Sequence, residues 1–114
     1  VLLSEGVNKR GISLTRIAEI TSYNPARIFN LYPQKGIIRP GSDADLTFVD
    51  LEMEKTVTAK DLYSLSDFSI YEGYRLRGWP TLTMVRGEIV MREGKIVGKE
   101  GFGQFLKRNA FLSS

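Results

Sequence analysis

Asp43 and Asp45, which lie two residues apart after a Pro-Gly turn, are the pair with the clearest chemical potential. On a strand their carboxylates would share one face, and hard cations such as Ca²⁺ bind sets of carboxylate oxygens. No third ligand follows at loop spacing, and Ser42 and Asp43 are both turn formers. We therefore interpret Asp43 as part of the turn and Asp45 as the cap of a strand entry, with cation binding as the alternative.

Ser64, Ser66 and Asp67 form a second cluster, in which a serine would act as a nucleophile. Such a serine needs an adjacent base, but the chain contains no His and nothing places Lys60 near either serine. The absence of Cys excludes a thiol nucleophile, disulfides and thiolate metal sites. We expect a polar loop here, and we assign no catalytic, cofactor-binding or metal-binding residue to the chain.

Aromatic and basic residues in the second half of the chain raise the question of nucleic-acid binding. Stacking on single-stranded bases needs exposed aromatic rings beside cations. The candidates are Tyr71, Tyr74, Trp79 and Phe102 with Arg75, Arg77 and Arg86. A net charge of only +3, with scattered charges, favours a core and a solvated basic surface instead. The run 101–106 is not a dinucleotide fingerprint, because its sixth residue is Leu106 rather than Gly.

The tail from residue 98 to residue 114 combines spaced glycines with apolar and basic side chains. Exposed apolar strips usually mark interfaces, so the tail is a candidate docking strip for another subunit. Packing on the same chain is an equal alternative. The apolar members are Phe102, Phe105, Leu106, Phe111 and Leu112.

Length and composition are those of a single small unit. The chain has 114 residues, of which 42% are hydrophobic and 25% charged, as in ordinary globular domains. No apolar run approaches the roughly 18 residues of a membrane span. The first residues lack the basic front and apolar core of a signal peptide, so we expect Val1 to begin a fragment or a processed piece.

The elements that must position these residues begin with helices. Ser13 is a good N-cap, and an apolar stripe with helical spacing follows over 14–21. Asn24 and Pro25 give a second start signal, because Asn caps helices and Pro fits the first helical position. The second helix is expected to end one or two residues before Pro33, since proline disfavours helix in the residue that precedes it.

From Gly36 onward the sequence is typical of strands and turns. Short strands are predicted over 46–49 and 56–58. One helical turn is predicted over 59–63, and a loop over 64–73.

The strongest strand signal spans 81–97. Gly78-Trp79-Pro80 is expected to break the regular structure just before it. Two-residue turns at Arg86-Gly87 and Glu93-Gly94 predict three antiparallel strands. The predicted partners are Val85 with Glu88, Met84 with Ile89, Thr83 with Val90, Leu82 with Met91, Arg92 with Lys95, Met91 with Ile96 and Val90 with Val97. One face would carry Leu82, Met84, Ile89, Met91 and Ile96. Both faces are apolar, so both should be covered.

The order of these motifs resembles the C-terminal part of the cyclic amidohydrolases, most closely the hydantoinase and dihydropyrimidinase branch. The match runs over residues 2–108. Several branches share the segments 3–9 (LSEGVNK), 21–29 (TSYNPARIF) and 41–46 (GSDADL). The segments that narrow the branch are 71–73 (YEG), 78–80 (GWP), 85–87 (VRG) and 98–108 (GKEGFGQFLKR).

This resemblance implies an α+β fragment of a larger enzyme. Residues 1–34 would be the last helical part of a (β/α)8 amidohydrolase barrel. Residues 35–98 would be the C-terminal portion of a composite β-sandwich with a three-strand meander. Residues 99–114 would form an extended tail toward a neighbouring subunit.

The implied activity belongs to the full-length parent, a cytoplasmic homo-oligomer that hydrolyses C–N bonds of cyclic amides. The family's two zinc ions are held by His side chains, a carboxylated Lys and an Asp on the barrel strands. None of those motifs is present, so this chain is expected to bind no cofactor and to be inert by itself. The family's ring-binding Asn lies upstream of Val1, so neither Asn8 nor Asn24 takes that role.

Two alternatives stay open at this point. The parent would belong to the dihydroorotase or allantoinase branch, or the chain would be a non-catalytic β-sandwich module that binds a partner.

Overall fold

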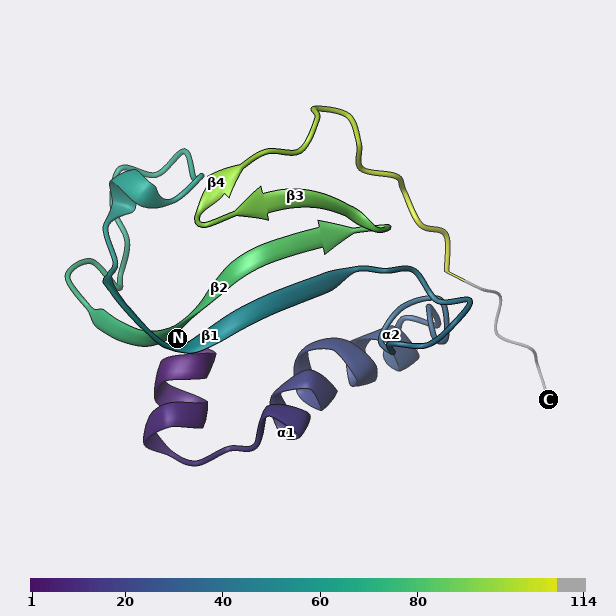
Figure 1. Ribbon diagram of the computed structural model, residues 1–114, viewed down its shortest axis with the longest axis horizontal. Helices are drawn as coiled ribbons and strands as arrows, with labels where there is room; N and C mark the ends of the chain where they lie inside the picture. The colour runs from purple at the N-terminus through teal and green to yellow at the C-terminus, as the bar shows by residue number, and fades with distance from the viewer. Residues whose placement is uncertain (109–114) are drawn as a thin grey trace.

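The computed structural model describes residues 1–108. Helical segments within residues 2–28, which we call the helical strip, lie beside one antiparallel sheet (Figure 1). The helical segments are η1 (Leu2–Lys9), α1 (Leu14–Ala18), η2 (Glu19–Tyr23), α2 (Asn24–Ile28) and η3 (Ala59–Asp61). The strands are β1 (Leu46–Thr56), β2 (Arg75–Val85), β3 (Glu88–Arg92) and β4 (Lys95–Ile96). They pair in the order β1-β2-β3-β4.

Helices followed by a four-stranded sheet agree with the predicted α+β class. The sandwich and the boundaries at 34 and 98 stay predictions, because residues 1–108 contain a single sheet. Phe111 and Leu112 lie outside the described residues. Within 1–108, no helix is long and apolar enough to cross a bilayer.

The segments α1, η2 and α2 follow one another without a break, although two separate helices were predicted. Ser13 caps α1 as expected, since its side chain accepts a hydrogen bond from the Arg16 N–H at 3.1 Å. Asn24 does not cap, because its backbone is helical and its N–H bonds to the Glu19 carbonyl in a π turn. Pro25 follows directly and has no N–H to satisfy, so the helix continues through it.

The end of α2 comes earlier than predicted. The helix stops at Ile28, and Asn30 adopts a left-handed backbone with φ of 57°. The N–H groups of Leu31 and Tyr32 then both donate to the Ala26 carbonyl, at 2.7 and 3.1 Å. These two hydrogen bonds satisfy a carbonyl at the C-terminal end of the helix, so the helix ends several residues before Pro33.

Strand β1 is longer than the two short strands predicted over 46–49 and 56–58. It runs for 11 residues, with an irregularity in its pairing between Asp50 and Glu54. At that point the Asp50 carboxylate accepts the N–H groups of Glu52 and Met53, at 2.9 and 3.3 Å. The side chain thereby satisfies backbone donors where the strand pairing is interrupted.

Gly78-Trp79-Pro80 lies inside β2, so the prediction that these residues break the structure before residue 81 is wrong. Pro80 stands opposite Val49 next to a register shift, a position at which a strand tolerates the missing proline N–H. Gly78 has φ of 103° and is buried against η1. Gly78 and Pro80 therefore lie within the strand and do not end it.

The hairpin between β2 and β3 begins in the predicted register and then shifts. Val85 lies opposite Glu88 and Met84 opposite Ile89, as predicted, but Thr83 lies opposite Met91. Val90 is the extra residue of a bulge, which the sequence pattern did not reveal. Met91 and Ile96 pair as predicted, yet they share a face with Thr83 and not with Leu82, Met84 and Ile89.

Segment η1 is the part of the helical strip that packs closely on the sheet. Ser4 is 2% exposed, and its hydroxyl accepts the Arg77 N–H at 3.1 Å. The Asn8 amide donates to the carbonyls of Leu51 and Arg77, at 3.0 and 2.7 Å. These bonds reach both β1 and β2, which fixes η1 across the two strands.

The chain exposes more surface than a compact domain of its mass. Its accessible surface is 8955 Å², whereas a compact monomer of this mass exposes about 6,300 Å². Its radius of gyration is 16.1 Å, against about 13 Å for a compact domain. The buried apolar side chains are few and include Ala26, Val57 and Leu76. The expectation that both sheet faces are covered is therefore not met by residues 1–108 alone.

Replacement of Gly78 by Ala should destabilise the protein more than replacement of Gly73 by Ala. Both glycines have positive φ, which costs an L-residue about 1–2 kcal/mol. A Cβ at Gly78 would also lie 2.9 Å from the Leu3 Cβ, while one at Gly73 meets nothing within 4 Å. Overpacking should add about 1–3 kcal/mol for Gly78→Ala. Urea unfolding measures both variants, and equal losses would contradict a tight contact between η1 and β2.

Candidate functional site

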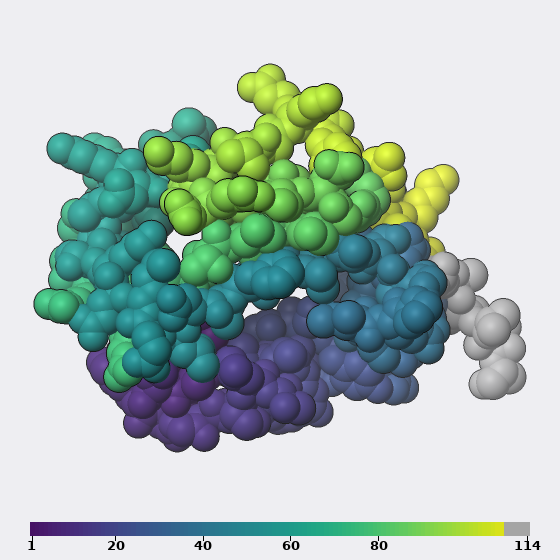
Figure 2. Space-filling model, in the orientation of Figure 1, coloured from purple at the N-terminus to yellow at the C-terminus, as the bar shows by residue number. Residues whose placement is uncertain are grey.

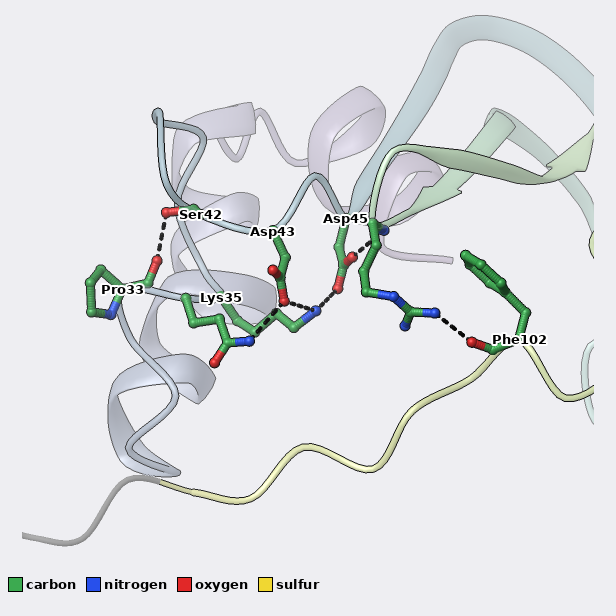
Figure 3. A network of polar contacts seen from close by, with 8 residues as sticks. Pro33, Lys35, Ser42, Asp43, Asp45 and Phe102 are labelled. Atoms are coloured by element: carbon green, nitrogen blue, oxygen red, sulfur yellow. Dashed lines mark hydrogen bonds and ion pairs between the residues drawn. The ribbon is translucent and has the colours of Figure 1, made fainter.

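Lys35 places its ammonium group between the carboxylates of Asp43 and Asp45 (Figure 3). Its Nζ lies 2.8 Å from Asp43 Oδ2 and also contacts Asp45 Oδ2. The Gln34 side-chain amide donates to Asp43 Oδ2 at 3.1 Å. The two aspartates singled out in the sequence are therefore brought together, but around a lysine that the sequence analysis did not connect with them.

Backbone hydrogen bonds fold the turn back so that this contact forms. The Asp43 N–H donates to the Gln34 carbonyl at 2.9 Å, and the Ser42 N–H donates to the Arg39 carbonyl at 3.2 Å. The Ser42 hydroxyl donates to the Pro33 carbonyl at 2.6 Å. A Pro-Gly turn with acids after it and a lysine before it is the sequence signal that predicts this arrangement.

Asp45 also joins the turn to the hairpin between β2 and β3. Its Oδ1 accepts the Arg86 N–H at 2.8 Å, and the neighbouring Ala44 carbonyl accepts the Gly87 N–H at 3.0 Å. The carboxylate therefore bonds Lys35 with one oxygen and the hairpin backbone with the other. This geometry gives Asp45 a structural role at the entry of β1.

The Arg86 side chain connects this network to the tail at Phe102, which is labelled in Figure 3. Its guanidinium lies 4.3 Å from the centre of the Phe102 ring and donates a hydrogen bond to the Phe102 carbonyl. Cation–π stacking and a charged hydrogen bond act on the same residue. Arg86 thus ties residue 102 to the hairpin.

The charges of this network stabilise one another. Partial burial lowers the pKa of Lys35, but hydrogen bonds to Asp43 and Asp45 outweigh it and hold the pKa above its ordinary 10.5. The hydrogen bond from Lys35 is the main reason that the pKa of Asp43 lies below its ordinary 3.8, and Gln34 adds to it. Lys35 and Asp43 therefore both stay charged throughout the neutral range.

The donor groups of this site do not fit a metal centre. The chain has no His and no Cys, and residues 1–108 contain no group of three or more His, Cys, Asp or Glu side chains placed to hold an ion. The Asp43 and Asp45 carboxylates already bind an ammonium group. The two zinc ions implied by the resemblance find no ligand set in the described part of the chain.

Serine side chains of the loop over 64–73 accept hydrogen bonds from the backbone of the same loop. Ser64 Oγ accepts the Ser66 N–H at 3.0 Å, and Ser69 Oγ accepts the Tyr71 N–H at 3.2 Å. Such bonds to the N–H two residues ahead are typical of serine turns. The hydroxyl of Ser64 therefore accepts a backbone hydrogen bond.

The arginines considered for nucleic-acid stacking pair mostly with acids of β1. Arg75 lies 2.5 Å from Glu54 Oε2, and Arg77 contacts Glu52. The rings of Tyr71 and Tyr74 meet edge to face at 5.8 Å, while the Trp79 Nε1–H donates to the Leu76 carbonyl. These residues make cross-strand and local contacts and do not form one stacking platform.

An apolar groove of about 1020 Å³ lies between the helical strip and β1. Its lining includes Leu14, Ile17, Phe29, Leu46 and Val49, and Lys35, Asp43 and Asp45 also border it. Figure 2 shows the helical strip and the strands as two masses that meet along this side. The charged network therefore stands beside an apolar space that the described residues leave open.

Comparison with protein families gives one matching model, the amidohydrolase family, over residues 1–90. Among characterised proteins, an L-hydantoinase of Paenarthrobacter aurescens is 42% identical over 114 residues, which are 100% of this chain and 25% of that enzyme. A D-hydantoinase of Ralstonia pickettii is 38% identical over 111 residues, which are 97% of this chain and 24% of that enzyme.

Solved structures agree with the sequence relatives. The L-hydantoinase (dihydropyrimidinase) from Arthrobacter aurescens superposes with a TM-score of 0.90 at 44% identity, covering 94% of this chain and 24% of that one. The dihydropyrimidinase from Brevibacillus agri NCHU1002 gives a TM-score of 0.88 at 37% identity, covering 94% and 23%. The chain spans about a quarter of the length of these relatives.

Removal of the Lys35 charge should lower stability in a manner that depends on pH. The depressed pKa of Asp43 means that its contribution is present above 3.8 and is lost as the pH falls through the folded-state value. The raised pKa of Lys35 means that its contribution is present below 10.5 and is lost as the pH rises through the folded-state value. The stability gap between wild type and Lys35→Met should therefore be widest at neutral pH and narrow at both extremes.

Thermal unfolding across the pH range measures this gap. Lys95→Met, at an exposed position of β4, is the matched control and should show no such profile. A gap for Lys35→Met that stays constant from neutral to acidic pH would contradict the ion-pair interpretation.

Proposed function

Because this chain belongs to the amidohydrolase family, within the hydantoinase and dihydropyrimidinase branch, we propose that it is the C-terminal quarter of an enzyme that hydrolyses C–N bonds of cyclic amides. The observation that carries this proposal is the 42% identity to an L-hydantoinase across 100% of the chain. Relatives named as D-hydantoinase and dihydropyrimidinase support the same reaction class.

The catalytic groups of such an enzyme would lie in the remainder of the parent. The resemblance implies a centre with two zinc ions, and the donor set described above does not fit one. We therefore assign no step of the hydrolysis to any residue of this chain. Its proposed role is to complete the fold of the parent, with residues 1–34 closing a barrel and residues 35–98 forming part of a sandwich.

The exposed apolar surface supports this role. The chain presents about 2,600 Å² more surface than a compact monomer of its mass. Large side chains such as Phe29 and Phe48 are 63% and 50% exposed; Phe29 directly follows α2 and lines the groove, and Phe48 lies on β1. Burial of such surface is the main favourable contribution in folding, so the remainder of the parent is the natural cover.

The parent is proposed to be a cytoplasmic homo-oligomer that uses the tail in its assembly. The tail leaves the hairpin at Phe102 and presents Phe105 with 90% of its surface exposed. An exposed aromatic side chain beside basic residues is typical of an interface anchor.

The full-length protein that contains this chain should open a cyclic amide ring. Purified parent, assayed with hydantoin, dihydrouracil, dihydroorotate and allantoin, is expected to hydrolyse hydantoin or dihydrouracil fastest. The isolated 114 residues with added zinc should show no turnover. Faster turnover of dihydroorotate or allantoin would contradict the assignment of the branch, and activity that copurifies with the 114-residue chain would contradict its structural role.

The isolated chain should also bind an apolar dye that the full-length parent does not bind. Its apolar groove and sheet face are open, whereas the parent would cover them. Fluorescence of 1-anilinonaphthalene-8-sulfonate at equal molar concentration measures the difference. Equal and weak fluorescence from both proteins would favour an independently folded module.

A further inference from the structure

The helical strip is attached to the sheet at its first end by η1. The Ser4 hydroxyl accepts the Arg77 N–H at 3.1 Å, and the Asn8 amide donates to the Arg77 carbonyl at 2.7 Å. Gly78 lies so close to η1 that a Cβ there would be 2.9 Å from the Leu3 Cβ. Both partners of each contact belong to this chain, so the attachment does not depend on surfaces that the rest of the parent covers.

The other end of the strip is attached through the turn over 33–45. A Cβ at Gly36 would lie 2.5 Å from the Ala26 Cβ, and Ala26 itself is only 6% exposed. The backbone N–H of Lys35 donates to the Leu31 carbonyl at 3.0 Å. The turn therefore packs directly against the last helical segment, α2.

Lys35 joins this turn to the sheet. Its ammonium group contacts Asp45 Oδ2, and Asp45 Oδ1 accepts the Arg86 N–H at 2.8 Å in the hairpin between β2 and β3 (Figure 3). The side chains of Lys35 and Asp45 are 23% and 35% exposed, so solvent screens this pair less than an ion pair on an open surface. The backbone of Lys35 thus binds the helical side, and its side chain binds the sheet side.

The two attachments lie at opposite ends of a stiff element. The segments α1, η2 and α2 have five residues each and follow one another without a break, so together they span about 22 Å. An apolar groove lies between them and β1, and Figure 1 shows η1 and α2 at opposite ends of that strand. With the α2 end released, a tilt of about 3° at the other end would move it by about 1 Å.

We propose that Lys35 and Asp45 are positioning residues for the hydrolysis, because they hold the α2 end of the helical strip at a fixed place on the sheet. This role rests on the proposed function, in which residues 1–34 close the barrel that carries the active site. Barrel active sites are built from loops at one end of the strands, and the helices pack around those strands. A displacement of about 1 Å can cost about a hundredfold in rate, so even the small tilt would affect catalysis.

Steady-state kinetics of the full-length parent with hydantoin and dihydrouracil test this role. Lys35→Met should lower kcat about three- to thirtyfold and leave KM within about twofold, because the substrate contacts remain while their alignment is lost. Lys35→Arg should retain most of kcat, since a guanidinium also binds carboxylates. Asp45→Asn keeps an oxygen for the Arg86 N–H and should lose less kcat than Asp45→Ala, which keeps none.

Glu72→Ala is the matched control for a loss of stability alone. The Glu72 carboxylate accepts the Ala59 N–H at 2.7 Å, and Ala59 follows the end of β1, whereas the turn over 33–45 precedes its start. This variant should unfold at a lower temperature than wild type and keep its kcat. All rates are measured well below each unfolding temperature. An equal loss of kcat in Glu72→Ala and Lys35→Met would indicate general destabilisation and overturn the positioning role.

Hydrogen exchange in the parent gives a measurement that needs no substrate. In Lys35→Met, the amides of Leu31 and Tyr32, which close the end of α2, should exchange about tenfold faster or more. The amide of Arg77, which donates to Ser4 at the other attachment, should keep its rate. Unchanged exchange at residues 31 and 32, or an equal acceleration at Arg77, would refute an attachment that acts on α2.

The two measurements distinguish a failure of this role from a failure of the proposed function. An active parent whose Lys35→Met variant keeps its kcat would overturn the positioning role and leave the proposed function intact. A parent that opens no cyclic amide ring would contradict the proposed function and any role of Lys35 in that reaction. Faster exchange at residues 31 and 32 would then still confirm that Lys35 fixes the helical strip.

Discussion

The ammonium group of Lys35, set between Asp43 and Asp45, is the contact on which the arrangement of this chain depends. It lies where the helical strip ends and the sheet begins, and its two partners come from the far side of a tight turn. Through Asp45 it reaches the backbone of Arg86, and through Arg86 it reaches Phe102. The turn that follows the helical strip, the hairpin and the tail therefore share one polar network instead of one continuous core.

This dependence follows from how little apolar surface the chain buries. A compact domain would locate its elements by packing, but here buried apolar side chains are sparse and an apolar groove separates α1 and α2 from β1. Within residues 1–108, η1 is hydrogen-bonded to the strands through Ser4 and Asn8. In such a segment, hydrogen bonds and ion pairs fix the relative positions of the elements. The hydrophobic contribution, which has no preferred direction, must come from contacts with surfaces outside the segment. This is the behaviour expected of a segment whose fold is completed elsewhere.

Features with a local cause were predictable from the sequence. The Ser13 cap, the helical turn near residue 59 and the first pairs of the hairpin depend on residues a few positions apart. The errors arise where a distant partner decides. Val90 is a bulge because of its neighbouring strands, Pro80 fits in β2 because of a shift opposite Val49, and Lys35 meets two aspartates because a turn brings them back. A continuous helix through Pro25 required a π turn, which has no sequence signature of its own.

The backbone of Arg86 has a consequence for the evolution of this fold. Arg86 and Gly87 have φ of 46° and 84°, so the hairpin turns through two left-handed residues. Asn or Gly at the first position would suit that turn better than Arg does. Selection for thermal stability alone would thus act against arginine here, while selection for a tail of defined direction would retain it. Position 86 is a point at which the preferred geometry of a turn and the contact with Phe102 place opposing demands on a single residue.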